Sequence, residues 1–223
     1  VLQMVEEEDV EFIRLQFTDM YGNIKNIAIT ARELPRALAN KYKVDSSYIA
    51  GVASMGDPDM YLYPDPDTFI ILPWRPQQGK VARTLCDIYR PDGTPLDMST
   101  RYILKKTALE AAKDGYTCYV DPECEFFLFH TDDNGMPTTL THEKAGYLDV
   151  APVDLGENAR RDIVLNLEEI GFDVESSHHE TAPAQHEIDF RYREMTEMAD
   201  CIMTFKMTVR MIAKRHGLHA TFM

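Results

Sequence analysis

Four glutamates in two pairs, each pair close to a short apolar segment, constrain this chain more than any other feature. Glu123 and Glu125 precede the aromatic run 126–129, and Glu180 and Glu187 precede a second apolar segment, 188–192. A short aromatic-rich run favours a β-strand, in which residues two apart point to the same face. We therefore expect the carboxylates of the first pair to leave one face of a sheet.

The second pair is separated by Pro183, which argues against one continuous helical face. A loop that turns back onto the sheet would bring Glu180 and Glu187 to one ion. The usual explanation of any single glutamate is a solvated surface residue. Four carboxylates gathered in a half-buried site, however, repel one another unless cations neutralise them. Oxygen ligands in this number suit Mg²⁺ or Mn²⁺ better than Zn²⁺, so the sequence predicts a divalent-metal site built on a sheet.

Three histidines, His178, His179 and His186, lie in the same stretch as the second glutamate pair. Imidazole binds many transition metals, so these residues are possible ligands. They are equally possible as hydrogen-bond donors that orient the ligating carboxylates. We favour the orienting role.

Charge and hydropathy argue against two classes of partner. The 223 residues carry a formal net charge of −14, and the sequence pI is about 4.9. Such a surface repels phosphate backbones and anionic lipid head groups, so we expect no nucleic-acid partner and no membrane partner. No apolar stretch approaches the roughly 20 residues that cross a bilayer. The acidic segment 6–9 is unlike the basic start of a signal peptide, and a cytoplasmic location is expected.

The four cysteines, Cys86, Cys118, Cys124 and Cys201, are scattered and form no C-x-x-C pair. This spacing argues against a structural zinc site and against a disulfide framework. We expect all four to be buried, unreactive thiols, with Cys124 pointing away from its glutamate neighbours into the core.

The first part of the chain predicts a small strand-rich α+β unit. Residues 10–29 alternate between apolar and polar side chains around the turn sequence 21–23, as in a hairpin. Thr30 and Glu33 resemble a capping box before a short helix. Further strands are expected at 68–72 and 80–88, and the segment 89–95 is the best linker candidate.

The second part changes to a mixture of long helices and strands. Helices are expected at about 99–114, 158–170 and 196–216, with Gly115, Gly171 and Gly217 at their ends, and strands at 117–120, 125–129, 172–176, 188–192 and from 218 onward. The division gives domains at 1–95 and 96–223. A hydrophobic strand at the last residue suggests that a longer protein continues beyond it.

Several nucleotide and nucleophile motifs are absent from the sequence. It contains no G-x-x-x-x-G-K-[ST] loop, no G-x-G-x-x-G after a strand and no G-x-S-x-G elbow. A bound nucleotide would therefore be held by metals and side chains. Carboxylate sites with several metals suit phosphoryl transfer, because cations neutralise the phosphate oxygens.

These features together resemble type I glutamine synthetase, the ATP-dependent ligase that joins ammonia to glutamate. The stretches that carry the resemblance are 12–19, 59–65, 87–89, 122–129, 154–158, 177–180 and 216–223. The seven-residue step from Glu180 to Glu187 resembles the alpha subtype, which is not adenylylated. The resemblance implies an α+β fold with an N-terminal β-grasp domain followed by part of an antiparallel-sheet catalytic domain. It also implies a dodecamer of two hexameric rings with active sites shared between neighbouring subunits.

The resemblance also implies roles for the acidic residues. Glu125, Glu180 and Glu187 would hold the first Mg²⁺ or Mn²⁺, and Glu123 would contribute to the second. The metals would neutralise the phosphate oxygens of ATP while the γ-carboxylate of L-glutamate attacks. Ammonia from ammonium would then displace phosphate from γ-glutamyl phosphate.

Further roles concern the substrates. Glu175 matches a nucleotide-contacting glutamate, and Tyr192 is a weaker candidate for stacking on adenine. Asp45 matches the aspartate that a neighbouring subunit lends to the ammonium site, where a carboxylate attracts NH₄⁺ and accepts its proton. Trp74 would sit near the same subunit junction, although a core position explains it equally well.

Two departures from the family pattern stand out. The family usually reads Gly-Ser-Ser where this chain has Ser46, Ser47 and Tyr48. Ser54 replaces an arginine found in glutamine-inhibited members, which argues against feedback control through that position. The family's metal-binding histidine, glutamate-binding loop, phosphate-binding arginines and flap glutamate would lie beyond residue 223, so we expect the chain alone to be inactive.

Other readings remain open. One is a γ-glutamyl-amine (polyamine) ligase of the same superfamily, which differs in its amine acceptor. Another is a metal-binding assembly domain without catalytic activity. A two-metal phosphatase is the least favoured, because no nucleophile or histidine-rich ligand set supports it.

Overall fold

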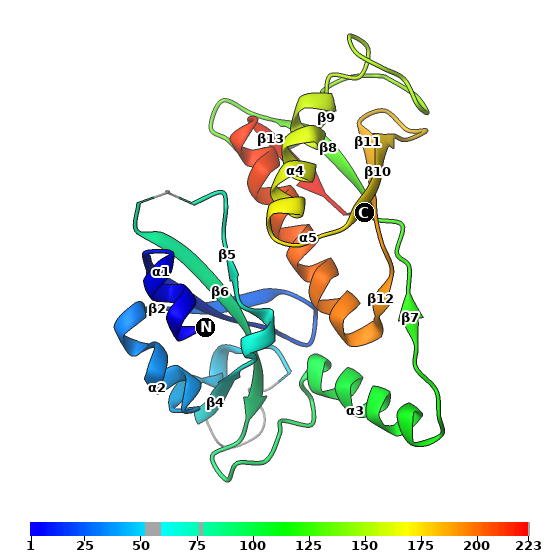
Figure 1. Cartoon of the computed structure of the whole chain (residues 1–223). Helices are drawn as coiled ribbons and strands as arrows, with labels where there is room; N and C mark the ends of the chain where they lie inside the picture. Colours follow the sequence, from blue (N-terminus) through cyan, green and yellow to red (C-terminus); the bar gives the residue numbers. More distant parts are fainter. Residues whose placement is uncertain (52–58, 76–77, 223) are drawn as a thin grey trace. The chain divides into compact units, whose positions relative to one another are not determined.

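A short helix, α1, followed by the β1–β2 hairpin begins the first of two units in this computed structural model, which describes residues 1–51, 59–75 and 78–222 (Figure 1). The chain divides into the units Val1–Cys118 and Tyr119–Met223. The first unit contains α1 (Leu2–Glu7), β1 (Val10–Thr18), β2 (Ile24–Thr30), a 3₁₀ turn (Ala31–Glu33), α2 (Leu34–Leu38), β3 (Tyr42–Asp45), a 3₁₀ turn (Ser46–Tyr48), β4 (Asp59–Pro64), a 3₁₀ turn (Pro66–Thr68), β5 (Ile70–Ile71), β6 (Lys80–Tyr89) and α3 (Thr100–Lys113).

One six-stranded sheet organises the first unit, in the order β2-β1-β6-β4-β3, with β5 also paired to β6. The predicted hairpin is confirmed: β1 and β2 pair antiparallel, and the Asp19 carboxylate accepts hydrogen bonds from the backbone N–H groups of Tyr21 and Asn23 in the turn. β1 also pairs in parallel with β6, which sets Ile13 opposite Ala82. The core side chains alternate along the strands and come from β1, α2, β4 and β6, chiefly Ile13, Leu15, Leu34, Met60, Leu62 and Ile88.

Three local expectations for this unit need correction. Thr30 makes no capping hydrogen bond through its side chain, so the capping box is wrong. The strand expected at 68–72 shrinks to Ile70–Ile71, because the Asp65 carboxylate accepts from the N–H of Asp67 and starts a 3₁₀ turn. Strands β3 and β4 were not expected from the sequence.

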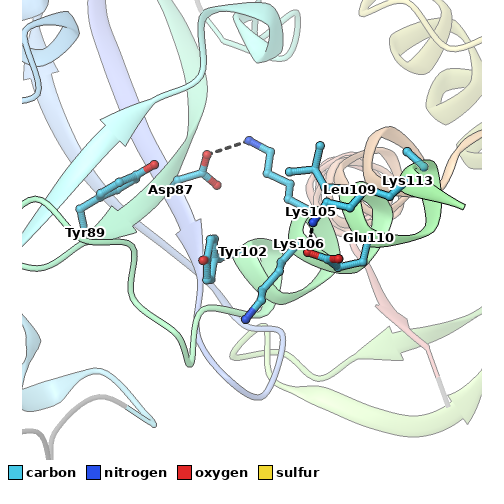
Figure 2. A pocket seen from close by; sticks show the side chains of 9 residues that line it. Asp87, Tyr89, Tyr102, Lys105, Lys106, Leu109, Glu110 and Lys113 are labelled. Atoms are coloured by element: carbon cyan, nitrogen blue, oxygen red, sulfur yellow. Dashed lines mark hydrogen bonds and ion pairs between the residues drawn. The ribbon is translucent and has the colours of Figure 1, made fainter.

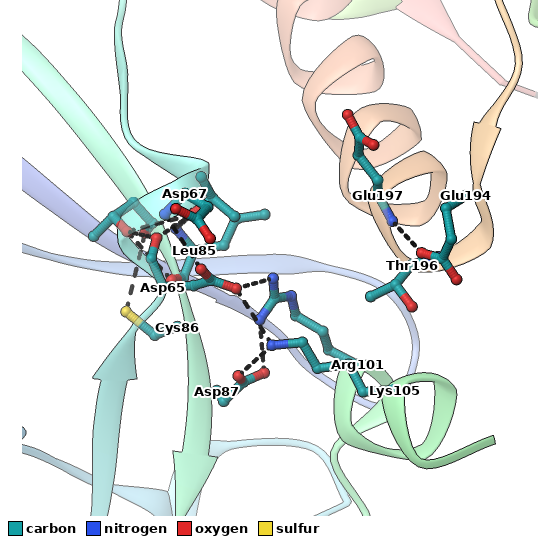
Figure 3. A network of polar contacts seen from close by, with 12 residues as sticks. Asp65, Asp67, Leu85, Cys86, Asp87, Arg101, Lys105, Glu194, Thr196 and Glu197 are labelled. Atoms are coloured by element: carbon teal, nitrogen blue, oxygen red, sulfur yellow. Dashed lines mark hydrogen bonds and ion pairs between the residues drawn. The ribbon is translucent and has the colours of Figure 1, made fainter. Parts of the chain in front are cut away.

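Helix α3 attaches to the first unit through charges rather than through apolar packing. Within the described residues it has no buried side chain. Arg101 donates to Asp87 at 2.8 Å and to Asp65 at 2.7 Å, and Lys105 contacts the same two carboxylates at 2.7 and 3.3 Å (Figure 3). We call these four residues the α3 charge cluster. These contacts explain why α3 groups with the first unit, while the predicted functional boundary after residue 95 stays a prediction.

The second unit is a five-stranded sheet supported by two helices. It contains β7 (Tyr119–Val120), β8 (Glu125–Thr131), β9 (Pro137–Thr141), α4 (Glu157–Glu169), β10 (Val174–His179), β11 (Gln185–Phe190), β12 (Arg193–Glu194), α5 (Met195–Arg215) and β13 (Leu218–Thr221). The strand order is β10-β11-β8-β13, with β9 also on β8, and β12 pairs separately with β7. All pairings in this unit are antiparallel.

The two helices predicted for the second unit are confirmed within a residue at each end. The α5 N-terminus is capped by Glu194, whose carboxylate accepts from the N–H of Thr196 at 2.8 Å (Figure 3). Phe205 of α5 packs between Phe126 of β8 and Phe190 of β11, with ring centroids 6.2 and 5.5 Å apart. The sheet therefore has one face sealed by aromatic side chains, and the opposite face is available for polar residues.

The cysteines differ from expectation. Cys86 is buried and Cys118 is exposed, while Cys124 and Cys201 are half-buried, so the prediction of four buried thiols is wrong. Cys124 lies just before β8, outside the regular alternation that was expected to turn it into the core. Its burial nevertheless raises the pKa of the thiol to about 12, which keeps it protonated and unreactive at neutral pH.

Candidate metal-binding site

A row of polar side chains crosses three neighbouring strands of the second unit. Glu125 at the start of β8 pairs with Glu187 of β11, and Glu187 pairs with His178 of β10. Directly paired residues of an antiparallel sheet project from the same face. Their chain neighbours Phe126 and Ile188 are buried on the other face. The strand register therefore brings together side chains that are more than sixty residues apart in sequence.

Glu180 joins this row from the turn that follows β10. His178 Nε2 lies 2.9 Å from Glu180 Oε1 and 3.6 Å from Glu187 Oε2. One potential ligand atom from each of these three residues lies within 4.8 Å of the other two. The loop predicted to return Glu180 and Glu187 to one place is therefore present. We call Glu125, His178, Glu180 and Glu187 the carboxylate row.

Gln185 connects Glu125 to the same turn. Its side-chain amide donates to Glu125 Oε2 at 2.6 Å and accepts from the N–H of Ala182 at 3.1 Å. Glu180 additionally accepts from the N–H of Thr181 at 3.0 Å. The carboxylates are thus held in place by groups that donate hydrogen bonds without neutralising their charge.

The electrostatics of the row favour a cation. Burial, followed by the adjacent carboxylates of Asp189 and Glu180, raises the pKa of Glu187 to about 8. Burial also opposes ionisation of Glu180, but hydrogen bonds from Thr181 and His178 outweigh it and lower the pKa of that carboxyl. In the absence of metal, Glu187 therefore keeps a proton that a divalent cation would replace.

Asp189 was missed by the sequence analysis. It follows Glu187 by two residues on β11, the same spacing that drew attention to Glu123 and Glu125. The signal was therefore present in the sequence, and applying the alternation rule to this segment would have found it.

Glu123 does not share the geometry expected for it. β8 begins only at Glu125, and Glu123 is an exposed residue in the irregular segment after Pro122. Proline lacks a backbone donor, which disfavours a strand at that point. The alternation argument for the first pair is therefore wrong, and strand geometry does not fix the direction of the Glu123 side chain.

The remaining predicted residues lie elsewhere. Glu175 is exposed on β10 with its carboxylate 3.4 Å from Arg191 Nε, and the exposed Tyr192 meets Tyr119 edge-on with ring centroids 5.8 Å apart. In the first unit, Asp45 is exposed at the end of β3. Its carboxylate accepts hydrogen bonds from Ser47, which lower its pKa. Trp74 is half-buried, and Ser54 lies outside the described residues.

His179 and His186 lie beneath the row and are fully buried. The ring of His186 has a pKa lowered to about 2 by burial and by the positive charge of Arg160, so it is neutral. Of the three histidines considered as ligands, only His178 faces both Glu180 and Glu187.

Apart from the carboxylate row, a hollow lies in the first unit, beside α3 (Figure 2). It encloses about 630 Å³ and is lined by Asp87, Tyr89, Tyr102, Lys105, Lys106, Leu109, Glu110, Ala112 and Lys113. Lys105 already contacts Asp87, and Lys113 donates to Glu110 at 2.7 Å. Because these charged side chains are paired with one another, we expect the hollow to attract a charged ligand less strongly than the carboxylate row attracts a cation.

No helix among the described residues is long and apolar enough to cross a membrane.

Comparison with known families identifies both parts of the chain. The family described as "Glutamine synthetase, beta-Grasp domain" matches residues 9–91, and "Glutamine synthetase, catalytic domain" matches residues 97–223. Curated relatives named glutamine synthetase include a Clostridium saccharobutylicum protein, 56% identical, and a Staphylococcus aureus (strain MW2) protein, 50% identical. In each case all of this chain aligns with 50% of the relative, so the chain spans about half the length of these proteins.

Solved structures agree with this fold. The structure of a GmaS/ADP complex superposes with a TM-score of 0.89 at 26% identity, covering 100% of this chain and 51% of that one. A Plasmodium falciparum glutamine synthetase superposes with a TM-score of 0.87 at 21% identity, covering 100% of this chain and 49% of that one. The predicted fold class, a β-grasp domain followed by an antiparallel-sheet catalytic domain, is confirmed.

Proposed function

The chain belongs to the glutamine synthetase family, and we propose that it forms the first half of an ATP-dependent glutamate–ammonia ligase of type I, alpha subtype. The observation that carries the proposal is the carboxylate row. Glu125 and Glu187 are directly paired on β8 and β11, and Glu180 and His178 each place a potential ligand atom within 4.8 Å of one on Glu187. The proposed reaction makes L-glutamine from L-glutamate and ammonium through γ-glutamyl phosphate. The half of the protein beyond this chain would complete the site.

The residues present fit a divalent cation. Glu125, Glu180 and Glu187 supply oxygen donors of the kind that Mg²⁺ and Mn²⁺ prefer. We assign these three to one ion and Glu123 to a second. When bound, the cations would neutralise phosphate oxygens during phosphoryl transfer. Gln185 and Thr181 orient the carboxylates through the hydrogen bonds described above, and His178 Nε2 lies 2.9 Å from Glu180 Oε1.

The nucleotide and ammonium roles are proposed from the family resemblance. Glu175 and Tyr192 would contact the nucleotide, and the solved GmaS relative contains ADP. Both side chains are exposed and so are accessible to a ligand. Asp45 would act in the active site of a neighbouring subunit, where its exposed carboxylate attracts NH₄⁺. This role requires an oligomer, which we propose to be the dodecamer of two hexameric rings, with functional domains at 1–95 and 96–223.

A γ-glutamyl-amine ligase remains the second candidate, because a structure with the different name GmaS is among the most similar folds. The two candidates differ in the amine acceptor. Rates of ADP release by the complete polypeptide, with ammonium or with alkylamines and polyamines as acceptors, separate them.

The decisive experiment for the proposed function uses the complete polypeptide that contains this chain. Glu125→Ala should abolish Mg²⁺- or Mn²⁺-dependent formation of γ-glutamyl hydroxamate. Glu168→Ala is the matched control, because Glu168 is an exposed glutamate on α4. Full hydroxamate synthesis by the Glu125 variant would refute the assignment. Complete inactivity of the wild-type polypeptide with bound metal would favour the non-catalytic assembly domain instead.

A further inference from the structure

Beneath the carboxylate row lies a group of five buried ionisable residues, none of which has a role in the proposed reaction as a ligand of metal or substrate. They are Glu143, Asp154, Arg160, His179 and His186. Burying charged groups costs free energy even when they are paired, so such groups are weak evidence of stabilisation. Their contacts show instead which parts of the backbone they hold.

Glu143 contacts both ends of the turn that carries Glu180. Its carboxylate accepts from the N–H of Ala184 at 2.5 Å and faces His179 Nε2 at 2.8 Å. His179 Nδ1 lies 2.6 Å from the backbone oxygen of Glu180. A carbonyl oxygen only accepts, so His179 donates there. Glu143 therefore reaches one end of the turn directly and the other end through one imidazole.

The turn needs such support because its backbone is strained. Ala184 has a φ of 59°, a left-handed conformation that costs about 1 kcal/mol or more for a residue with a side chain. Within the turn, Glu180 donates its N–H to the oxygen of Gln185 at 2.7 Å. Ala184 also accepts from the N–H of Leu128 in β8 at 3.0 Å. The turn sets where Glu180 lies relative to Glu187, since it carries Glu180 itself and leads into β11, which carries Glu187.

Glu143 is itself fixed by its own loop. Its carboxylate also accepts a short hydrogen bond from the N–H of Ala145. With two backbone N–H donors and the His179 ring around it, the carboxylate has little freedom to rotate. Glu143 links two segments that are 41 residues apart in the chain, the loop after β9 and the turn between β10 and β11.

The other buried pair serves a different part of the backbone. Arg160 contacts Asp154 at 2.8 Å and donates to His186 Nδ1 at 2.9 Å. Asp154 also accepts from the N–H of Gly156, just before α4. A Cβ on Gly156 would collide with the His186 ring, so this pair holds the start of α4 against β11. Among the described residues Asp154 and Arg160 form no hydrogen bond or ion pair with the turn, although an Asp154 carboxylate oxygen lies within 4.8 Å of a His179 ring nitrogen. Asp154 is therefore a stringent control, since it is close to the clamp without being part of it.

We propose that Glu143 is a positioning residue that, together with His179, clamps the Glu180–Ala184 turn and so fixes Glu180 for a divalent cation shared with Glu187. The inference rests on the proposed function of the carboxylate row. In this proposal Glu143 is not a ligand of the ion. It acts through the backbone, and its loss loosens the geometry of the site rather than removing a ligand.

The test measures Mn²⁺ binding by electron paramagnetic resonance on the complete polypeptide, with unfolding followed in parallel. Glu143→Gln keeps the size of the side chain but turns an amide N–H₂ toward a backbone N–H donor. It should raise the Kd for Mn²⁺ about tenfold, the effect usual when a group that orients a metal ligand is lost. Asp154→Asn should lower the unfolding midpoint while leaving the Kd within about twofold, the matched control for a buried carboxylate.

A second variant keeps the test decisive if Glu143→Gln fails to fold. His179→Gln removes the imidazole that connects Glu143 to the backbone oxygen of Glu180, and it should also raise the Kd for Mn²⁺ about tenfold. Where both fold, the double variant should bind no more weakly than the worse single variant, because both act through one turn. Wild-type Mn²⁺ affinity in the folded His179 variant overturns the proposal, and so does an equal loss in Asp154→Asn. If the wild-type protein binds no Mn²⁺, the proposed function itself fails.

Discussion

The α3 charge cluster and the carboxylate row are both built from acidic side chains on sheets, yet they differ in how their charges are balanced. In the α3 charge cluster, Asp65 and Asp87 meet Arg101 and Lys105. The acids and bases are equal in number, so the cluster completes itself. In the carboxylate row, His178 is the nearest base to Glu180 and Glu187. The surplus of negative charge is what gives the second cluster a reason to bind a cation.

The largest effect on stability should come from removing one of the two bases of the α3 charge cluster. Arg101→Ala leaves two partly buried carboxylates with only Lys105 between them, and we expect the first unit to lose about 3 kcal/mol of unfolding free energy. Urea unfolding followed by Trp74 fluorescence reports on this unit, because Trp74 is the chain's one tryptophan. The control is Lys113→Ala, which breaks an exposed pair and should cost less than about 0.5 kcal/mol. Equal costs would mean that the cluster does not hold α3.

The next largest effect on stability should come from adding a divalent cation to the carboxylate row. Mn²⁺ at about 100 times its Kd should stabilise the second unit by about 2.7 kcal/mol. Thermal unfolding monitored by circular dichroism, with Mn²⁺ or with EDTA, measures the shift. Glu180→Gln should reduce the shift strongly, whereas Asp65→Asn should leave it unchanged. A shift of the same size in both variants would place the ion elsewhere.

A smaller effect of opposite sign should follow from removing an ionisable group that must take up a proton when the metal-free chain folds. Glu187→Gln places a neutral amide between Glu180 and Asp189, and in EDTA we expect the chain to gain up to about 1 kcal/mol. The same substitution should abolish the stabilisation by Mn²⁺. A loss of stability in EDTA would show that the row is already balanced, which would erase the contrast with the α3 charge cluster.

The smallest effect concerns acid. Burial raises the pKa of Asp65, but Arg101 and Lys105 outweigh it, so the net pKa is lowered. The unfolded state therefore takes up the proton first, and the stability that Asp65 contributes is present above its ordinary pKa and is lost as pH falls below about 4. Urea midpoints between pH 6 and pH 3 should fall less steeply in Asp65→Asn than in wild type. Parallel curves would show that other carboxylates control this range.

Local patterns predicted the elements that depend on neighbours in sequence. The β1–β2 hairpin, α4 and α5 follow from apolar periodicity and from turn residues, and each lies where the sequence indicated. Glu125, Glu180 and Glu187 were singled out, with Glu123, because they lie beside strong strand signals. Their assignment to one ion came from the family resemblance and stays a proposal.

Features set by distant pairing could not be predicted in the same way. β3 and β4 are short strands that pair with each other, and β4 also pairs with β6, so the signal for both lies in their partners rather than in their own residues. Glu143 carried no motif, because its role comes from a turn 41 residues later. Glu123 was misjudged for the converse reason: a local rule was applied where no strand partner exists among the described residues.

The parallel pairing of β1 with β6 has a consequence for synthesis of the chain. Val10 pairs with Lys80, and β6 then supplies the edge on which β5 and β4 assemble. The hairpin can close early on the ribosome, but about 50 further residues separate its end at Thr30 from the start of β6 at Lys80, the strand that covers its other edge. Until β6 is synthesised, the free edge of β1 is exposed and can pair with other unfolded chains, so aggregation is most favoured in this interval.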